Sequence, residues 1–312
     1  VNESIRGSDL FIISDTVNYH ETYDMHGNKT HMSPDDHFMD LKRVIMACSG
    51  HPRRITVIMP YLYEGRQHVR LINESLDCAQ AMQELIRMGV ETIITFDAHD
   101  NRVQNAIPNN GFDNFFTSYQ FISTILNDMP DLIVDNEHLM TISPDEGGMR
   151  RAVFYSNQLG VDMGMFFKRR NYSTLVNGEH PVISMEFLGN DVSGKDVIIV
   201  DDMIASGESV FDIIVELKKR RAAHIFVATT FAFFTEGVER FEQFYTDGMF
   251  TKVYSTNLTY VNPRALEAQW FQQVDMSKFM AKIINTLNHD SSISPLLDAT
   301  EKIRALMDKM GG

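Results

Sequence analysis

The chain has 312 residues, of which 44% are hydrophobic and 22% charged, and its formal net charge at pH 7 is −14. This composition is typical of a globular protein, and the length suffices for two α/β domains. The negative charge argues against nucleic acid as a partner, because binding its backbone requires a basic surface. We find no signal peptide and no apolar run near the ~18 residues of a membrane span. The two cysteines, Cys48 and Cys78, indicate packing residues in a cytoplasmic protein.

Short strands alternate with helices in the first half of the chain. Strands are expected at residues 10–14, 54–59 and 91–96, helices at 38–48 and 74–88, and a polar surface loop at 15–36, and residues 111–116 are expected to close this half. Arg66 and Gln67 follow the second strand, and Asp97, His99 and Asp100 follow the third. Loops at the carboxyl ends of strands tend to be functional, and a histidine set between acids is a candidate for binding a metal or a phosphate.

The second half has the same rhythm, which predicts two parallel α/β domains. Strands are expected at 139–143, 161–167, 197–200, 224–230 and 252–255. Helices are expected at 119–126, after residue 148 as far as 158, and at 210–219, 237–245, 277–287 and 300–310. The sequence P-D-E-G-G follows Ser143 at the end of the first of these strands, and Lys168, Arg169 and Arg170 follow the second. The polar segment 171–181 is expected to be a mobile flap.

Residues 197–209, V-I-I-V-D-D-M-I-A-S-G-E-S, organise this half. The four apolar residues predict a buried strand that ends at Asp201 and Asp202. Small residues then lead into the helix 210–219, whose N-terminus would bind an anion. Vicinal carboxylates can accept hydrogen bonds from ribose hydroxyls, so the pattern indicates a sugar phosphate site. The alternative is an ordinary helix N-cap and turn.

This stretch resembles the phosphoribosyl-diphosphate loop that type I phosphoribosyltransferases share with ribose-phosphate diphosphokinases. Further similarities to the diphosphokinases follow their order along the chain: residues 3–7 (E-S-I-R-G), 60–67 (P-Y-L-Y-E-G-R-Q), 97–99 (D-A-H), 143–148 (S-P-D-E-G-G) and 168–170 (K-R-R). The chain is identified as a divergent member of that family. The resemblance implies two type I phosphoribosyltransferase-like domains, each a mainly parallel sheet flanked by helices, over 1–118 and 119–290, with a tail at 291–312.

The resemblance also implies a reaction and its site. Family members transfer the diphosphoryl group of ATP to the anomeric hydroxyl of ribose 5-phosphate, giving 5-phosphoribosyl 1-diphosphate and AMP for nucleotide biosynthesis. The implied residues are Lys168 and Arg170 for catalysis; Arg170, Asp201, Asp202, Ala205, Ser206, Gly207, Glu208 and Ser209 for ribose 5-phosphate; Arg66 and Gln67 for ATP; and His99 and Asp145 for Mg²⁺. A homo-oligomer whose ATP site is shared between subunits is expected as well.

Some residues depart from the family pattern. Ala205 stands where the family usually has aspartate, Glu208 where it has glycine or alanine, and His68 where it has aspartate. The family segment that precedes E-S-V-R-G is not found, so we expect that an N-terminal part is missing. Because a carboxylate would repel a bound phosphate, Glu208 is expected to point outward. Two alternatives remain: a catalytically silent relative with a regulatory or structural role, and a phosphoribosyltransferase.

Overall fold

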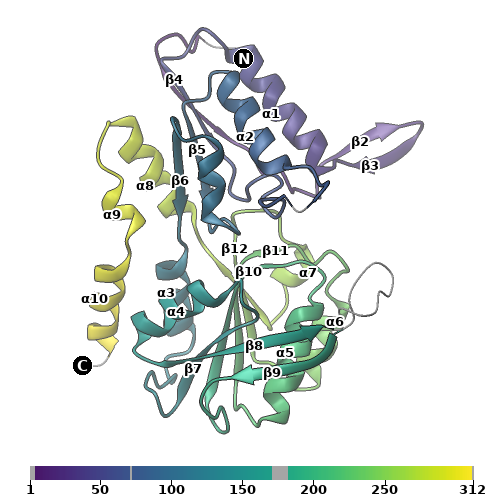
Figure 1. The fold of residues 1–312 in the computed structure, drawn as a ribbon, viewed down its shortest axis with the longest axis vertical. Coiled ribbons are helices and arrows are strands. Elements are labelled where there is room, and N and C mark those ends of the chain that lie inside the picture. Colours follow the sequence, from purple (N-terminus) through teal and green to yellow (C-terminus); the bar gives the residue numbers. More distant parts are fainter. Residues whose placement is uncertain (1–3, 71, 171–181, 311–312) are drawn as a thin grey trace. The chain divides into compact units, whose positions relative to one another are not determined.

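The computed structural model describes residues 4–70, 72–170 and 182–310, which form two compact units (Figure 1). Unit 1 contains Val1–Thr117, Asn257–Tyr260 and Asp275–Asp298, and unit 2 contains Ser118–Thr256, Val261–Val274 and Ala299–Gly312. The expected domains, 1–118 and 119–290, were contiguous in sequence. The units are not, because two segments beyond residue 256 group with unit 1.

The sheet of unit 1 has four parallel strands in the order β1-β4-β5-β6. These are β1 (Asp9–Ile13), β4 (Arg54–Ile58), β5 (Thr92–Phe96) and β6 (Gly111–Phe115), and the helices are α1 (Pro34–Cys48), α2 (Asp77–Arg87), η1 (Asn101–Ala106), α8 (Ser277–Asn288) and α9 (Ser294–Leu297). The buried side chains of α1 and α2 pack with Ile55, Val57 and Ile93 on one face of the sheet. Phe279 of α8 contacts the rings of Phe96 and Phe115, so α8 belongs to a second apolar cluster of this unit.

An ionic network explains why the α8 segment belongs to unit 1. Arg54 of β4 donates to Asp9 of β1, to Asp290 and to the carbonyl oxygen of Leu287, each at 2.6 Å. Arg53 makes two further bonds to Asp9, and its guanidinium holds the pKa of that carboxyl below its usual range. The start of the sheet is therefore tied to the end of α8 by charge-assisted hydrogen bonds.

Residues 22–31 form a hairpin, so the prediction of a plain loop at 15–36 was wrong there. Strands β2 (Thr22–Met25) and β3 (Asn28–His31) pair antiparallel. Their two-residue turn has positive φ at His26 (50°) and Gly27 (79°), as hairpin turns of this length require. β2 (T-Y-D-M) alternates polar and apolar residues over only four exposed positions, and β3 (N-K-T-H) contains no apolar residue, so the pattern is too short to predict a hairpin.

Unit 2 contains a seven-stranded sheet in the order β13-β12-β11-β10-β7-β8-β9, parallel except for the β8–β9 pair. Its strands are β7 (Leu139–Ser143), β8 (Asp162–Arg170), β9 (Val182–Leu188), β10 (Asp196–Ile204), β11 (Ile225–Ala232), β12 (Lys252–Thr256) and β13 (Phe271–Val274). Its helices are α3 (Ser118–Asp128), α4 (Met149–Leu159), α5 (Glu208–Lys219), α6 (Glu239–Thr246), α7 (Pro263–Leu266) and α10 (Thr300–Met310).

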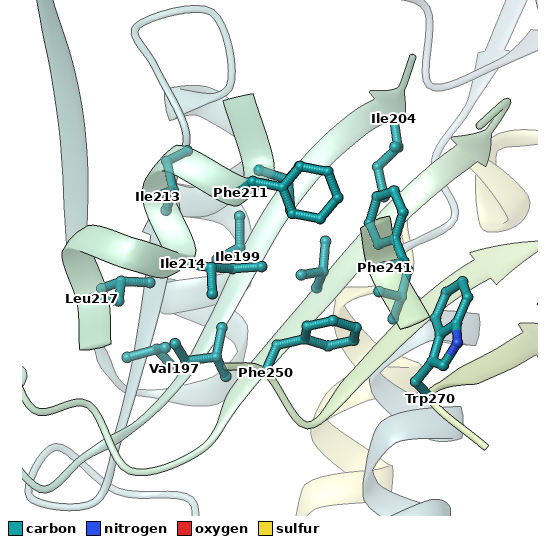
Figure 2. Packing of buried hydrophobic residues seen from close by; sticks show 14 of the residues in the cluster. Val197, Ile199, Ile204, Phe211, Ile213, Ile214, Leu217, Phe241, Phe250 and Trp270 are labelled. Atoms are coloured by element: carbon teal, nitrogen blue, oxygen red, sulfur yellow. The ribbon is translucent and has the colours of Figure 1, made fainter. Parts of the chain in front are cut away.

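β10 is central and buried on both faces. Its residues Val197 and Ile199 pack against Ile214 and Leu217 of α5 in a cluster that extends to Phe241 and Trp270 (Figure 2). α4 contacts both β7 and β10, and α3 contacts β12 and β13. A parallel strand covered in this way reads as a continuous apolar run, which is the signal that predicted it.

Several boundaries differ from the prediction. β10 does not end at Val200; it continues to Ile204 because Asp201, Met203 and Ile204 pair in register with β11. α5 begins at Glu208, two residues earlier than expected. β9 and β13 were not predicted, and 171–181, the expected flap, lie outside the described residues.

Two expectations about composition can be compared with the structure. Both cysteines are buried and unpaired, as expected of packing residues. Burial raises the pKa of the Cys78 thiol to about 12, which makes it unreactive at neutral pH. In the described ranges, no helix is both long enough and apolar enough to cross a membrane.

Gly207, the N-cap of α5, is sterically constrained, and its replacement is expected to destabilise unit 2. Its φ is +90°, and a Cβ would lie 2.7 Å from Phe241, a fully buried ring. Gly207→Ala should lower the free energy of unfolding by about 2–5 kcal/mol, of which about 1–2 arises from the left-handed backbone and about 1–3 from overpacking. Urea unfolding measures the loss.

Gly194→Ala is the matched control, because Gly194 also has positive φ (+78°) but its Cβ would meet nothing within 4 Å. Gly194→Ala should lower the free energy of unfolding only by the contribution of the left-handed backbone. Equal losses in the two variants would contradict the steric role of Phe241.

Candidate functional site

Asp201 and Asp202 lie at the carboxyl end of β10, where the strand pairs with β11. Asp202 is 5% exposed, and its backbone N–H donates to Asp201 Oδ1 at 2.8 Å. Burial raises the pKa of the Asp201 carboxyl well above its usual range, and the neighbouring Asp202 carboxylate raises it further, against the opposing effect of Arg151. Strongly perturbed carboxyls of this kind cluster at functional sites.

The loop from Ala205 to Glu208 turns the chain from β10 into α5. The carbonyl oxygen of Ala205 accepts from the N–H of Thr235 at 3.0 Å, and the Ser206 hydroxyl accepts from the N–H of Glu208 at 3.4 Å. Gly207 at positive φ then starts the helix, whose first N–H groups have no partner within it. The loop therefore ends at a helix N-terminus, which favours an anion.

Glu208 is the first residue of α5, and its side chain is exposed. That it points away from a bound phosphate stays a prediction. An acidic side chain in the first turn interacts favourably with the helix dipole, which is a reason for an acidic residue here that involves no ligand.

Asp145 follows β7, the parallel neighbour of β10. Its side chain is exposed; Oδ1 accepts from the N–H of Gly148 at 3.0 Å, and its carbonyl oxygen accepts from the Ser143 hydroxyl at 2.7 Å. A Cβ on Gly148 would lie 2.9 Å from Ser143 Oγ, so the close turn requires glycine. Since parallel strands end at one edge, Asp145 and residues 201–209 belong to the same edge of the unit 2 sheet.

Lys168, Arg169 and Arg170 are the last residues of β8 rather than residues after it. Lys168 pairs with Met185 and Arg170 with Val182 on β9, the strand that was not predicted. Their side chains lie outside what the structure describes. The backbone nonetheless brings this basic triplet to the carboxyl end of β8, which neighbours β7.

In unit 1, Arg66 and Gln67 lie in the segment after β4. Arg66 is exposed, and the Gln67 side-chain amide donates to the carbonyl oxygen of Ser75 at 2.9 Å. The preceding turn is closed by a bond from the N–H of Gly65 to the Leu62 carbonyl oxygen. Tyr63 stacks on Phe38 of α1 at a centroid distance of 4.2 Å, so the segment rests on the core.

The segment after β5 is held by two polar contacts that sequence reasoning missed. Asp97, buried and at φ +42°, accepts hydrogen bonds from the N–H and the hydroxyl of Thr117. The N–H of Ala98 donates to Asn114 Oδ1 at 3.0 Å. Both partners lie at the end of β6, which pairs with β5 only in the fold, so no local pattern identifies them.

These contacts present His99 at the carboxyl end of β5, with an exposed side chain. Its ring lies 5.2 Å from the ring of His68, and His68 Nε2 lies 3.4 Å from Asp100 Oδ2. The Arg102 guanidinium lowers the pKa of the Asp100 carboxyl to about 2. The structure therefore brings the Arg66–Gln67 segment and His99 together through His68.

His99 in unit 1 and Asp145 in unit 2 were expected to hold Mg²⁺. Within the described part of the chain, no three His, Cys, Asp or Glu side chains group to form a protein-only metal site. Mg²⁺ usually keeps several waters and takes one or two protein ligands besides substrate phosphates. The His99 imidazole and the Asp145 carboxylate are both exposed, and each by itself offers a ligand atom to such an ion.

Comparisons with known proteins agree on one family. Residues 1–89 match the N-terminal domain of ribose phosphate pyrophosphokinase, and residues 118–258 match the phosphoribosyl transferase domain. A ribose-phosphate pyrophosphokinase of Agrobacterium fabrum is 31% identical over 241 residues, which are 76% of this chain and 67% of that protein. One of Vibrio parahaemolyticus is 27% identical over 96% of this chain and 86% of that protein.

The fold is similar to that of phosphoribosylpyrophosphate synthetase from Mycobacterium smegmatis. The TM-score is 0.76 at 21% sequence identity, with 93% of this chain and 86% of that chain covered. The fold is therefore two phosphoribosyltransferase-like domains with mainly parallel sheets, as expected from the sequence.

The raised pKa of Asp201 has a consequence for stability. When folding raises the pKa of a carboxyl, that carboxyl favours the folded state at pH values below its pKa in the unfolded chain, which is near 3.8. This contribution to stability is lost as the pH rises through the higher pKa of the folded state. Asp201→Asn should therefore raise the melting temperature at pH 8 by about 2–4 °C, the effect of about 1 kcal/mol in a domain of roughly 150–250 residues. Near pH 4 the difference should disappear.

Thermal unfolding at the two pH values measures this, with the exposed Asp212→Asn as the matched control. Asp212→Asn should change the melting temperature by less than about 1 °C, since surface substitutions are usually within ±0.5 kcal/mol. A lower melting temperature of Asp201→Asn at pH 8 would contradict the assigned electrostatic cost.

Proposed function

The chain belongs to the ribose-phosphate pyrophosphokinase family, and we propose that it transfers the diphosphoryl group of ATP to the anomeric hydroxyl of ribose 5-phosphate. The products are 5-phosphoribosyl 1-diphosphate and AMP, which places the reaction in nucleotide biosynthesis. The observation that carries the proposal is the corner between β10 and α5, where two adjacent carboxyls meet a glycine-started helix.

The sugar phosphate would bind at this corner. Asp201 and Asp202 accept hydrogen bonds from the ribose hydroxyls, and the loop of Ala205, Ser206, Gly207, Glu208 and Ser209 holds the 5-phosphate through its backbone N–H groups. Ala205 can serve in place of the usual aspartate because this contact uses the backbone. Two adjacent carboxyls cost free energy because like charges repel. Hydrogen bonds from the ribose hydroxyls to these carboxyls would offset that cost.

The remaining proposed residues act on the nucleotide and on the developing charge. Arg66 and Gln67 bind ATP, and Lys168 and Arg170 neutralise charge on the transferring group, with Arg170 also close to the sugar phosphate. Phosphoryl transfer depends mainly on positioning and electrostatic stabilisation. Basic side chains therefore suffice, without a nucleophilic residue.

His99 and Asp145 would hold Mg²⁺. When bound, the ion would neutralise negative charge on the nucleotide phosphates. The segment that carries His99 is held by the bonds from Thr117 to Asp97 and from Ala98 to Asn114, and Asp145 is held by the bond from Gly148. Both side chains are exposed.

We also propose a cytoplasmic homo-oligomer whose ATP site is shared between subunits. Family resemblance motivates the shared site, and two buried unpaired cysteines fit a reducing compartment. A single-subunit mass in light scattering, or recovery of the protein in a membrane or secreted fraction, would contradict these two points.

The test of the function is AMP formation from ATP in the presence of Mg²⁺ and ribose 5-phosphate. We expect AMP to form only when ribose 5-phosphate is present, and not with ribose, which lacks the phosphate that the loop holds. Binding of both substrates without AMP formation would indicate the catalytically silent relative. Consumption of 5-phosphoribosyl 1-diphosphate with a free base would indicate a phosphoribosyltransferase.

Lys168→Ala should nearly abolish turnover while ribose 5-phosphate still binds. A cation that meets charge developing only in the transition state typically contributes about 3–4 kcal/mol, so kcat should fall about 10²–10³-fold. Steady-state kinetics and calorimetry measure the two effects. The control is Lys219→Ala, an exposed residue paired with Glu216 on α5, which should retain wild-type turnover. Near-normal kcat in Lys168→Ala would refute the role of Lys168.

A further inference from the structure

His68 lies between the two functional segments of unit 1 and is held from both sides. Its Nδ1 is 3.0 Å from the carbonyl oxygen of Arg66. Because a carbonyl oxygen only accepts, Nδ1 carries the proton in this bond. Its Nε2 faces Asp100 Oδ2 at 3.4 Å, on the segment after β5. Rotating the ring by half a turn would replace both nitrogens by carbon, so the two contacts specify its orientation.

Asp100 is itself fixed. It caps the helix η1 by accepting from the N–H of Arg102 at 2.8 Å, and the Arg102 Nε donates to both carboxylate oxygens at 3.0 Å. The side chains of His68 and Asp100 are only 20% and 15% exposed. The acceptor that faces His68 thus belongs to a rigid turn rather than to a mobile side chain.

The ring of His68 meets the ring of His99 edge to face, at a centroid distance of 5.2 Å and an interplanar angle of 63°. This is a favourable geometry for two aromatic rings. His68 therefore connects the carbonyl of Arg66, next to Gln67, with the imidazole of His99.

We propose that His68 is a positioning residue, which sets the orientation of the His99 ring relative to the Arg66–Gln67 segment. The inference rests on the proposed function for the roles of Arg66, Gln67 and His99. An aspartate at this position would bring a second carboxylate toward Asp100 and could not donate to the carbonyl oxygen of Arg66.

The test is a double-mutant cycle on metal binding with ATP and without ribose 5-phosphate, so that no turnover is needed. Mn²⁺ replaces Mg²⁺, and electron paramagnetic resonance measures the free ion. Groups that orient a ligating histidine typically contribute 10–100-fold in metal affinity. We expect His68→Ala to weaken Mn²⁺ binding at least about tenfold, and to have less than about a threefold effect in the His99→Ala background.

His51→Ala is the matched control, since His51 lies in the same unit. Within the described residues, the only hydrogen-bond partner of its side chain is Arg6. It should change the affinity less than about twofold. If His68→Ala fails to fold, His68→Asn replaces it: the amide retains a donor near the position of Nδ1 but removes the ring, and the same loss is expected.

The inference is overturned if His68→Ala binds Mn²⁺ with ATP as the wild type does, or if it loses as much affinity when His99 is already alanine. Wild-type protein that binds no Mn²⁺ with ATP would overturn it as well. Failure of the proposed function would be a separate result. In that case the protein binds Mn²⁺ and ATP with the expected coupling between His68 and His99, but it forms no AMP in the presence of ribose 5-phosphate.

Discussion

The burial of β10 on both faces is the constraint on which the proposed sugar phosphate site depends. Val197 and Ile199 pack against α5, while the strand pairs with β7 and β11 on its two sides. Burying each such side chain stabilises the fold by about 1.5–3 kcal/mol. This central strand can therefore carry Asp201 and Asp202 near its end, although burial and the neighbouring Asp202 carboxylate raise the pKa of the Asp201 carboxyl.

The same core fixes the loop that follows. The ring of Phe241 packs against Phe211 of α5 at 4.5 Å and leaves room only for glycine at position 207. The backbone conformation that starts α5 is thus determined by apolar packing below the loop. A phosphate would meet N–H groups that are already oriented, which lowers the entropic cost of binding.

Much of this could be predicted from the sequence, because the signals were local. The apolar run at 197–200, the acidic pair and the small residues after it lie within 13 residues, and the order of the other motifs indicated the family. The continuation of β10 to Ile204 could not be predicted, since it depends on pairing with β11. β9 has apolar residues at 183, 185 and 187 with polar residues between them, a strand pattern that was present in the sequence and was overlooked. The strands of the β2–β3 hairpin have only four residues each, too few to establish a period.

The supporting contacts of the site in unit 1 were equally out of reach. Thr117 and Asn114 reach the segment after β5 through strand pairing, and His68 reaches Asp100 across 32 residues of chain. His68 appeared in the sequence only as a departure from the family pattern. Its neighbours give it a role that neither spacing nor composition could indicate.

The central claim is that the corner between β10 and α5 binds a sugar phosphate. A crystal structure of the protein with ribose 5-phosphate tests it most directly. The account predicts the phosphate within hydrogen-bond distance of the backbone N–H groups of residues 205–209 and the ribose hydroxyls on Asp201 and Asp202. Ribose 5-phosphate bound elsewhere, or an empty corner at saturating concentration, would contradict it.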